Sequence, residues 1–387
     1  MNENLQSTFV HHHSKINHML RYYILIFLFG VSSITFAQPT SSWPIFRGDQ
    51  HLTGISGTTL PEKPVLLWTF ETGDNIKSAP VVADGKIVIG STDGFVYCID
   101  TNGKLLWKFE TSNSIEAPAL ILEKVVYIGN LNGTLYALDL NSGKKLWEYE
   151  CDNQIIGSAN WWKVEDKTHI VVGSYDFYLH CVDAKTGEGL WKYETDNFIN
   201  GAAACENGMA MFGGCDGYLH LVDIATGKLV KKIDVATYVA GSVAVEKDKA
   251  YIGDYDGRFF QVDLKTDKTT WVWSDDKTHL QFIASPALVG EKVLTANHNK
   301  FLYCFNKNTG EKLWEYNTGR NVEASPVVAK DKVLVANMRG DLAIVNLSDG
   351  KPVWTYELGG QIINNPAVAD GKIYVGNYDG NVYCFGK

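Results

Sequence analysis

Tryptophan recurs along this chain at a nearly constant spacing. The positions are Trp68, Trp107, Trp147, Trp191, Trp271, Trp314 and Trp354, with Val230 taking the same place after Trp191. Successive positions differ by 39, 40, 44, 39, 41, 43 and 40 residues. The segment before the tryptophan also repeats, with an Asx residue, a Gly and then Leu-Trp, in residues 139–147, 183–191 and 306–314. A period near forty residues limits the chain to architectures built from equal repeats.

One repeat, residues 77–110, shows what each unit is expected to form. It contains four short runs rich in Val, Ile, Tyr and Phe, at residues 80–83, 86–90, 95–99 and 104–109. The pairs between them are Asp84-Gly85, Asp93-Gly94 and Asn102-Gly103. Such Asx-Gly pairs supply the positive φ angles that tight hairpins need. Each unit is therefore predicted to be a four-stranded antiparallel meander, which needs its neighbours to bury both faces.

The two ends of the array predict how it closes. Residues 66–71 form one strand around Trp68 with no three strands before it, whereas residues 366–385 form three strands with no fourth after them. The N-terminal strand should therefore complete the last unit and hide both sheet edges. We expect an all-β fold, an eight-bladed β-propeller of four-stranded antiparallel blades, in which residues 38–387 form one domain.

Residues 1–37 have the pattern of an export signal. Residues 22–34 are mostly apolar, and Lys15 and Arg21 precede them. Of residues 35–37, the first and the last are small, which is the pattern recognised before a signal-peptide cleavage site. We expect cleavage before Gln38, which makes the protein periplasmic or secreted, soluble and free of a transmembrane span. Retention of the segment as an anchor stays open, although its apolar run is short for a membrane span. No cysteine stands at the cleavage point, so lipid attachment there is not expected.

Charge and cysteine content exclude several classes of function. The formal net charge of −9 argues against nucleic acid as a partner. Four cysteines occupy one repeat position, on the third strand of different blades, and are expected to be small buried residues: Cys98, Cys181, Cys304 and Cys384. The pairing of Cys151, Cys205 and Cys215 stays open. The chain has no Cys-x-x-Cys motif, so a zinc or haem attachment site has no sequence signal.

The repeat motif Asp-x-x-(x)-Gly-Lys-x-x-Trp, the Asp-Gly turns and the opening Trp-Pro-x-Phe-Arg-Gly-Asp of residues 43–49 resemble pyrroloquinoline-quinone-type propeller repeats. The resemblance covers about residues 43–387. This quinoprotein-like family includes eight-bladed dehydrogenases and the exported BamB proteins, which assist outer-membrane protein assembly. It implies that the recurrent tryptophans dock between neighbouring blades. Five aspartates of the motif are then turn residues rather than catalytic acids: Asp100, Asp139, Asp183, Asp223 and Asp263.

The resemblance also raises the question of a quinone cofactor. Quinoprotein dehydrogenases of this family stack the quinone against adjacent cysteines and hold calcium with carboxylate and amide side chains. This sequence has no adjacent cysteine pair and no long insertions, and no glutamate follows residues 254–257 at the spacing of a calcium loop. We therefore expect no cofactor, no metal and no catalytic residue. A quinone-dependent dehydrogenase of small alcohols or sugars, with calcium, remains the alternative.

One face of the predicted propeller gathers aromatic and polar turn residues. In an antiparallel meander, the turn between the second and third strands emerges on the same face as the link to the next blade. The candidate partner-binding residues there are Tyr175, Asp176, Tyr255, Asp256, His298, Met338, Arg339, Tyr378 and Asp379. Aromatic residues rimmed by polar groups suit protein contact, although Asx and Gly are also what such turns require. We expect a monomeric, non-enzymatic scaffold for a protein partner in the cell envelope, with a carbohydrate- or peptide-binding module as a further alternative.

Overall fold

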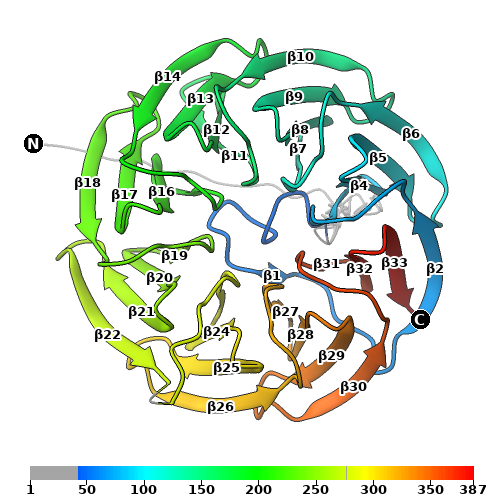
Figure 1. Ribbon diagram of the computed structural model, residues 1–387, viewed down its shortest axis with the longest axis vertical. Coiled ribbons are helices and arrows are strands. Elements are labelled where there is room, and N and C mark those ends of the chain that lie inside the picture. The colour runs from blue at the N-terminus through cyan, green and yellow to red at the C-terminus, as the bar shows by residue number, and fades with distance from the viewer. Residues whose placement is uncertain (1–41, 276) are drawn as a thin grey trace, which may run out of the picture. The chain divides into compact units, whose positions relative to one another are not determined.

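The computed structural model describes residues 42–275 and 277–387. All regular elements in these ranges are strands, and they form eight sheets arranged around a central axis (Figure 1). The predicted all-β, eight-bladed propeller is therefore confirmed. No helix within the described ranges is long and apolar enough to cross a membrane. The predictions for residues 1–37 fall outside the described residues.

Blades 1 to 4 follow one another along the chain, each from its innermost to its outermost strand. Blade 1 contains β3 (Val81–Ala83), β4 (Lys86–Gly90), β5 (Phe95–Asp100) and β6 (Leu105–Glu110). Blade 2 contains β7 (Leu120–Leu122), β8 (Val125–Gly129), β9 (Thr134–Asp139) and β10 (Lys145–Glu150). Blade 3 contains β11 (Asn160–Val164), β12 (Lys167–Gly173), β13 (Tyr178–Asp183) and β14 (Gly189–Glu194). Blade 4 contains β15 (Ala204–Glu206), β16 (Met209–Gly213), β17 (Tyr218–Asp223) and β18 (Leu229–Asp234).

Blades 5 to 8 complete the ring. Blade 5 contains β19 (Ala244–Glu246), β20 (Lys249–Gly253), β21 (Arg258–Asp263) and β22 (Lys268–Ser274). Blade 6 contains β23 (Ala287–Val289), β24 (Lys292–Ala296), β25 (Phe301–Asn306) and β26 (Lys312–Asn317). Blade 7 contains β27 (Val327–Ala329), β28 (Lys332–Ala336), β29 (Asp341–Asn346) and β30 (Pro352–Glu357), with β1 (Ile55–Ser56) added at its inner edge. Blade 8 contains β31 (Ala367–Ala369), β32 (Lys372–Gly376), β33 (Asn381–Gly386) and β2 (Val65–Glu71).

Blade 8 is assembled from both ends of the described chain. The N-terminal strand β2 pairs antiparallel with the C-terminal strand β33, and Trp68 lies opposite Cys384 (Figure 1). The predicted closure is therefore present, with β2 beginning one residue before residue 66. Since every outer strand has a partner, the ring leaves no blade incomplete.

The tryptophans fasten each blade to the next. Trp107 of β6 donates its indole N–H to the Leu140 carbonyl of blade 2 at 2.8 Å. Its ring lies against Gly143, where an added Cβ would come within 2.6 Å of the indole. Because Gly143 also has a φ of +69°, only glycine suits this turn. Five further tryptophans donate to the next blade in the same way: Trp68, Trp147, Trp191, Trp271 and Trp314.

The gap in the tryptophan series is filled by Lys231, not by Val230. In β18, Lys231 lies opposite Leu221, the register that Trp191 has in the preceding blade. Its Nζ donates to the Leu264 carbonyl of blade 5 at 2.6 Å and so replaces the indole N–H. Val230 is 49% exposed. The assignment of Val230 is therefore wrong, because tryptophan was replaced here by a long cation that makes the same bond and not by an apolar residue.

The aspartates that precede the tryptophans hold their turns closed. Asp100 accepts hydrogen bonds from the backbone N–H groups of Asn102 and Lys104, at 2.8 and 2.9 Å. Asp139, Asp183, Asp223 and Asp263 accept equivalent backbone bonds within their own turns. These carboxylates satisfy turn donors, as the resemblance implied.

A segment before β2, residues 43–56, lines the inner strands and is called the strap below. It makes backbone hydrogen bonds in turn to Val82, Ile121, Cys205, Val245, Leu288 and Val328, which are inner-strand residues of six different blades. It reaches blade 3 through a bond from Asn160 and blade 8 through a bond from Ser56 to Val368. The strap therefore contacts all eight blades in order.

Arg47 of the strap is fully buried near the axis. Its Nη2 donates to the carbonyls of Pro286 and Pro326 at 3.0 and 2.8 Å, which ties the strap to blades 6 and 7. Burial lowers the pKa of Arg47 to about 9, partly offset by Asp49. A buried cation held by two carbonyl groups fixes the position of the strap, since any displacement would remove the hydrogen bonds of a guanidinium that water does not reach.

We expect Trp107→Ala to lower the free energy of unfolding by roughly 3–5 kcal/mol, the usual cost of truncating a large core residue. Trp107 is 9% exposed and its N–H bond crosses the seam. Trp68→Ala should cost less, because Trp68 is only half-buried. Denaturant midpoints test this. An unchanged midpoint for Trp107→Ala would show that the indole does not hold the seam.

Removal of residues 42–72 should unfold the propeller or lower its melting temperature severely. The truncation deletes the outer strand of blade 8 together with the strap, which touches every blade. Thermal denaturation followed by circular dichroism measures the effect. A truncated chain that melts like the full one would contradict the role assigned to both elements.

Candidate interaction face

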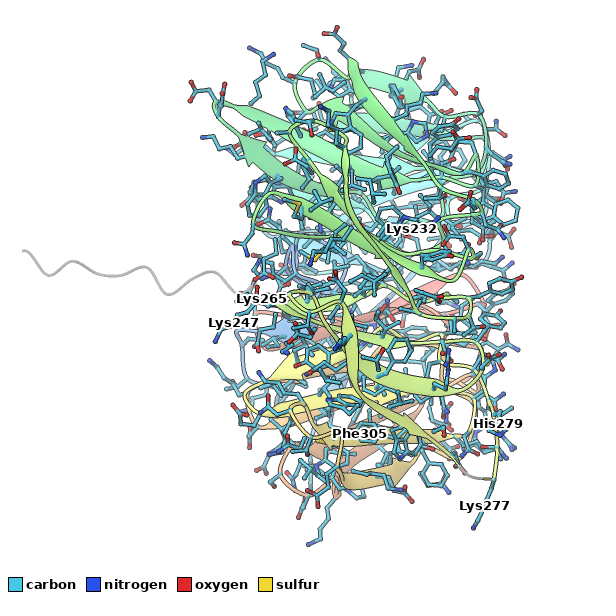
Figure 2. The ribbon with its side chains drawn as sticks, turned by 90° about the vertical axis from the view of Figure 1, so that its left-hand side faces the viewer. Lys232, Lys247, Lys265, Lys277, His279 and Phe305 are labelled. Carbon is cyan, nitrogen blue, oxygen red and sulfur yellow. The ribbon has the colours of Figure 1, made fainter. Side chains whose placement is uncertain are left out.

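The turns between second and third strands lie on the same face as the links that enter the blades, and this surface is called the link face. In all eight blades a turn residue donates its backbone N–H to a carbonyl of the entering link. The pairs are Thr92–Asn75, Leu131–Ser114, Tyr175–Gln154, Cys215–Phe198, Tyr255–Tyr238, His298–Gln281, Met338–Asn321 and Tyr378–Gln361. Figure 2 shows the propeller from its edge, with Lys277 and His279 on one side and Lys247 and Lys265 on the other. Lys277 and His279 belong to the link between β22 and β23, so their side of the propeller is the link face.

The nine predicted contact residues differ in what they expose. The exposed ones are Tyr255, Asp256, Arg339 and Asp379, and the half-buried ones are Tyr175, His298, Met338 and Tyr378. Arg339 forms an ion pair with Asp341 at 2.8 Å, and His298 lies 3.0 Å from a Glu323 oxygen. These two side chains therefore have partners within the chain already.

Asp176, the ninth predicted residue, lies differently from what we expected. Its side chain is only 5% exposed, and its Oδ2 lies 2.9 Å from Nε2 of His180. The carboxylate turns inward because it accepts a hydrogen bond from the ring of His180, a buried residue on β13, the third strand of the blade. Asp176 supports the turn from within and does not reach the surface of the link face.

Five aromatic residues lie on the link face over blades 3 to 5 and are called the aromatic ridge: Tyr175, Phe177, Phe198, Tyr238 and Tyr255. Tyr175 stacks on Phe198 with ring centres 4.6 Å apart, and Phe177 lies 5.1 Å from the same ring. Tyr238 and Tyr255 are joined through their backbones at 3.0 Å and are 53% and 46% exposed. Burial raises the pKa of Tyr175 to about 12. The ridge thus contains one group of rings packed around Phe198 and a second group formed by Tyr238 and Tyr255.

The backbone conformation of Phe177 indicates that the sequence requirements of the turns do not explain the ridge. It has a φ of +76°, which is unusual for a bulky residue and costs of the order of 1–3 kcal/mol. The same turn position holds a positive-φ glycine in six other blades: Gly94, Gly133, Gly217, Gly257, Gly340 and Gly380. The chain thus keeps a strained, 39% exposed phenylalanine where glycine would be easier. Phe177, Phe198 and Tyr238 were not among the residues predicted from the sequence. For Phe177 a signal was present, because it stands where the turns of six other blades hold glycine.

Charged pairs border the ridge. Lys232 lies 2.6 Å from Asp196, and Lys192 lies 3.9 Å from Asp152. The side chains of Asp152 and Asp196 are 86% and 76% exposed. Exposed aromatic rings inside a charged, solvated border form the arrangement that suits a protein partner, since the rings supply most of the binding energy.

The links also line a small funnel around the axis. The cavity has a volume of about 140 Å³, and Phe46 of the strap contributes to its wall. Serine side chains connect neighbouring blades around it, with backbone N–H groups donating to the hydroxyls of Ser242, Ser285 and Ser325 at 2.8–3.0 Å. Glu323 is the one carboxylate among the lining residues of the described chain. The funnel is thus narrow, and its hydroxyls are committed to holding the blades together.

Two seams beneath the link face contain the same buried network of tyrosine, histidine and aspartate. In the second, Tyr193 lies 3.0 Å from Nδ1 of His220, whose Nε2 lies 2.9 Å from Asp216. In the first, Tyr149 lies 3.1 Å from Nδ1 of His180. Both histidines are fully buried. His180 and His220 are therefore packed residues of the seams, and they form a structural element that occurs in two successive blades.

The cysteines described by the structure are all free. Cys98, Cys181, Cys304 and Cys384 are fully buried in four different blades, as their shared repeat position indicated. Cys151 and Cys205 are also buried, and Cys215 is half-buried on the link face. Burial raises the pKa of each of these thiols, which keeps them protonated near neutral pH.

We expect Asp216→Asn to destabilise the protein near pH 7 and to have a smaller effect in acid. Burial acts to raise the pKa of Asp216, but the hydrogen bond and charge of His220 outweigh it, so the pKa is lowered. A lowered carboxyl pKa contributes stability above the unfolded value of about 3.9, and this contribution is lost as the pH falls through the folded pKa. Denaturant midpoints at pH 7 and below pH 4 measure the difference.

The control for this prediction is Asp256→Asn, which removes the same charge from an exposed position on the link face. It should change stability by less than about 0.5 kcal/mol at either pH. If Asp216→Asn behaved like this control at pH 7, the buried pair would contribute nothing to stability.

Comparison with protein families gives one match across most of the chain. A family model described as outer membrane protein assembly factor BamB matches residues 65–160, 175–321 and 298–386. This match confirms the resemblance to pyrroloquinoline-quinone-type propeller repeats. The sequence has no significant match among curated proteins.

Several solved structures share the fold. The crystal structure of BamB from Moraxella catarrhalis has a TM-score of 0.70 at 22% identity, covering 84% of this chain and 98% of that one. A europium-containing methanol dehydrogenase has a TM-score of 0.76 at 12% identity, covering 90% and 98%. The quinohemoprotein alcohol dehydrogenase from Comamonas testosteroni has a TM-score of 0.74 at 14% identity, covering 90% and 81%. At such identities the likeness shows the fold alone.

Proposed function

The chain belongs to the family described as outer membrane protein assembly factor BamB, and we propose that it is an exported, non-enzymatic scaffold whose link face binds a protein partner in the cell envelope. The aromatic ridge is the observation that carries this proposal. It places five aromatic rings from three blades on one surface, and three of them, Phe177, Phe198 and Tyr238, occupy positions where the other repeats hold glycine or a polar residue.

The energetics of the ridge favour a macromolecular partner. Phe177, Phe198, Tyr238 and Tyr255 expose between 37% and 53% of their surface, and covering such rings is favourable at roughly 25 cal/mol per Å² of apolar area. Tyr175 and Phe198 already stack on each other, so little side-chain freedom is lost on binding. A rigid aromatic cluster with a polar border is the usual centre of a binding hot spot.

The charge of the chain suggests what the partner contributes. The net charge is −9, and Asp152, Asp196 and Asp256 stand exposed around the ridge. We infer a partner surface that carries basic residues next to an apolar patch. Such charge pairing speeds association and depends on salt, whereas the buried rings set the lifetime of the complex.

Several observations favour a scaffold over a quinone-dependent dehydrogenase. The central funnel measures about 140 Å³, below the roughly 300–1,000 Å³ of common small-molecule sites. Its lining includes a single carboxylate, Glu323, which is engaged with His298. Among described residues, the seven cysteines lie apart in the sequence and are free. These residues do not fit a quinone with a calcium ion, so we derive no reaction through one.

The double variant Phe198→Ala/Tyr255→Ala tests the proposed function. We expect it to lose most of the envelope proteins that the immobilised wild type captures, without a change in melting temperature, because both side chains are exposed, one in a link and one in a turn. The matched control is Leu146→Ala/Val272→Ala, which removes two exposed apolar side chains from outer strands (54% and 55% exposed). The control should capture partners as the wild type does.

Two results would argue against the scaffold. The first is equal capture by wild type, double variant and control, which would place binding elsewhere on the chain. The second is stoichiometric binding of pyrroloquinoline quinone with calcium-dependent reduction of a dye by added alcohols or sugars.

A further inference from the structure

Cys151 lies beside the first of the two buried networks. Its Sγ, a carboxylate oxygen of Asp176 and a ring nitrogen of His180 all lie within 4.8 Å of one another. Cys151 directly follows β10 of blade 2, whereas Asp176 and His180 belong to a turn and to β13 of blade 3. The three groups therefore come together only where blade 2 packs on blade 3, and no local sequence motif predicts them.

The next seam is a natural comparison for this one. There Tyr193, His220 and Asp216 form the same network at nearly the same distances, but Thr195 stands where Cys151 stands. Cys151 follows β10 and donates its backbone N–H to Gly133 at 2.8 Å, and Thr195 follows β14 and donates to Phe177 at 2.8 Å, so the two positions are equivalent. The network forms without a thiol, so its structural role does not explain the cysteine.

Other blades show which residue this position ordinarily holds. It is threonine in four of them, and each hydroxyl donates to a nearby backbone carbonyl: Thr72, Thr111, Thr195 and Thr318. A thiol is a weak hydrogen-bond donor and a poor substitute for that hydroxyl. It is, however, a strong metal ligand once it loses its proton.

We propose that Cys151, Asp176 and His180 bind a divalent cation that favours sulfur and nitrogen ligands, with zinc as the representative ion. Thiolate, imidazole and carboxylate are the three side-chain ligands of zinc, at about 2.3, 2.0–2.1 and 2.0–2.2 Å. Ligands at these lengths are separated from one another by about 3 to 4 Å. His180 and Asp176 are already 2.9 Å apart, so binding requires only a small approach of the thiol.

The surrounding bonds hold the ligands ready for an ion. Tyr149 lies 3.1 Å from Nδ1 of His180 and so orients the ring with Nε2 toward Asp176. Backbone N–H groups of Asp152 and Tyr178 donate to the two oxygens of Asp176, each at 3.0 Å. When the ion binds, the imidazole proton resides on Nδ1, facing the Tyr149 oxygen, and Nε2 becomes a ligand.

Two exposed side chains lie near the site. The side chains of Lys192 and Asp152 are 44% and 86% exposed and form only a loose pair at 3.9 Å. The three ligands themselves are almost completely covered, with Cys151 at 5% and His180 at 0%. Water or the second oxygen of Asp176 supplies the fourth ligand. The ion would pin blade 2 to blade 3 directly beneath the aromatic ridge, whose Tyr175 and Phe177 flank Asp176 in the chain.

Titration of metal-free protein with Co²⁺, a spectroscopic substitute for zinc, tests the site. We expect one ion per chain, an absorption band from the thiolate–cobalt bond, and displacement of the cobalt by Zn²⁺. Cys151→Thr installs the residue that four other blades carry, and it should abolish the band while the fold is retained. Cys215→Ser removes a more accessible thiol on the same face and should leave the band unchanged.

The gain-of-function variant Thr195→Cys keeps the test decisive, because misfolding cannot create a site. It completes the same ligand set at the next seam, and a second ion per chain is expected. The proposal is overturned if wild-type protein binds no stoichiometric Co²⁺, or if Cys151→Thr binds it as the wild type does. A band that disappears in Cys215→Ser would assign the metal to that exposed thiol and would equally overturn the proposal.

Discussion

The contact between a tryptophan and the glycine turn of the next blade is the interaction on which the rest of the propeller depends. The indole of Trp107 packs on Gly143 and donates to Leu140, and five other seams repeat this bond. A single four-stranded blade exposes both faces, so it is stable only when neighbours cover it. Because the seam bond is directional, it sets the position of each blade and not only its burial. Lys231 shows that the bond to the carbonyl survives even where the aromatic ring has been lost.

The strap and blade 8 make the ring a closed unit with two different faces. The strap binds the inner strands of the blades in order, with Arg47 buried between blades 6 and 7. The aromatic ridge lies on the link face over blades 3 to 5. The packed seams between repeats provide stability, whereas the exposed turn residues are free to vary. The strained φ of Phe177 is tolerated because the surrounding blade is stable.

Two seams beneath the ridge contain buried networks of tyrosine, histidine and aspartate. His180 and His220 each join a tyrosine of one blade to an aspartate of the next turn. Two nearly identical copies, one with Cys151 and one with Thr195, separate the structural role of the network from what the thiol adds. The comparison within one chain is informative because backbone position, burial and hydrogen-bond partners are matched.

The sequence by itself determined the period, the strand count, the eight blades and the closure by Trp68 with the C-terminal strand, because these depend on local turn chemistry and on spacing. It also indicated the face on which Tyr175 and Tyr255 lie. Only the tertiary structure decided that Asp176 turns inward, that Lys231 replaces tryptophan, and that Phe198 and Tyr238 join the ridge. Lys231 and the ridge depend on contacts across seams or between links and turns, whereas Asp176 turns toward His180, which is four residues away but becomes a partner only once the strand is buried. The meeting of Cys151 with His180 has the same origin, since a seam brings together groups that no repeat pattern places side by side.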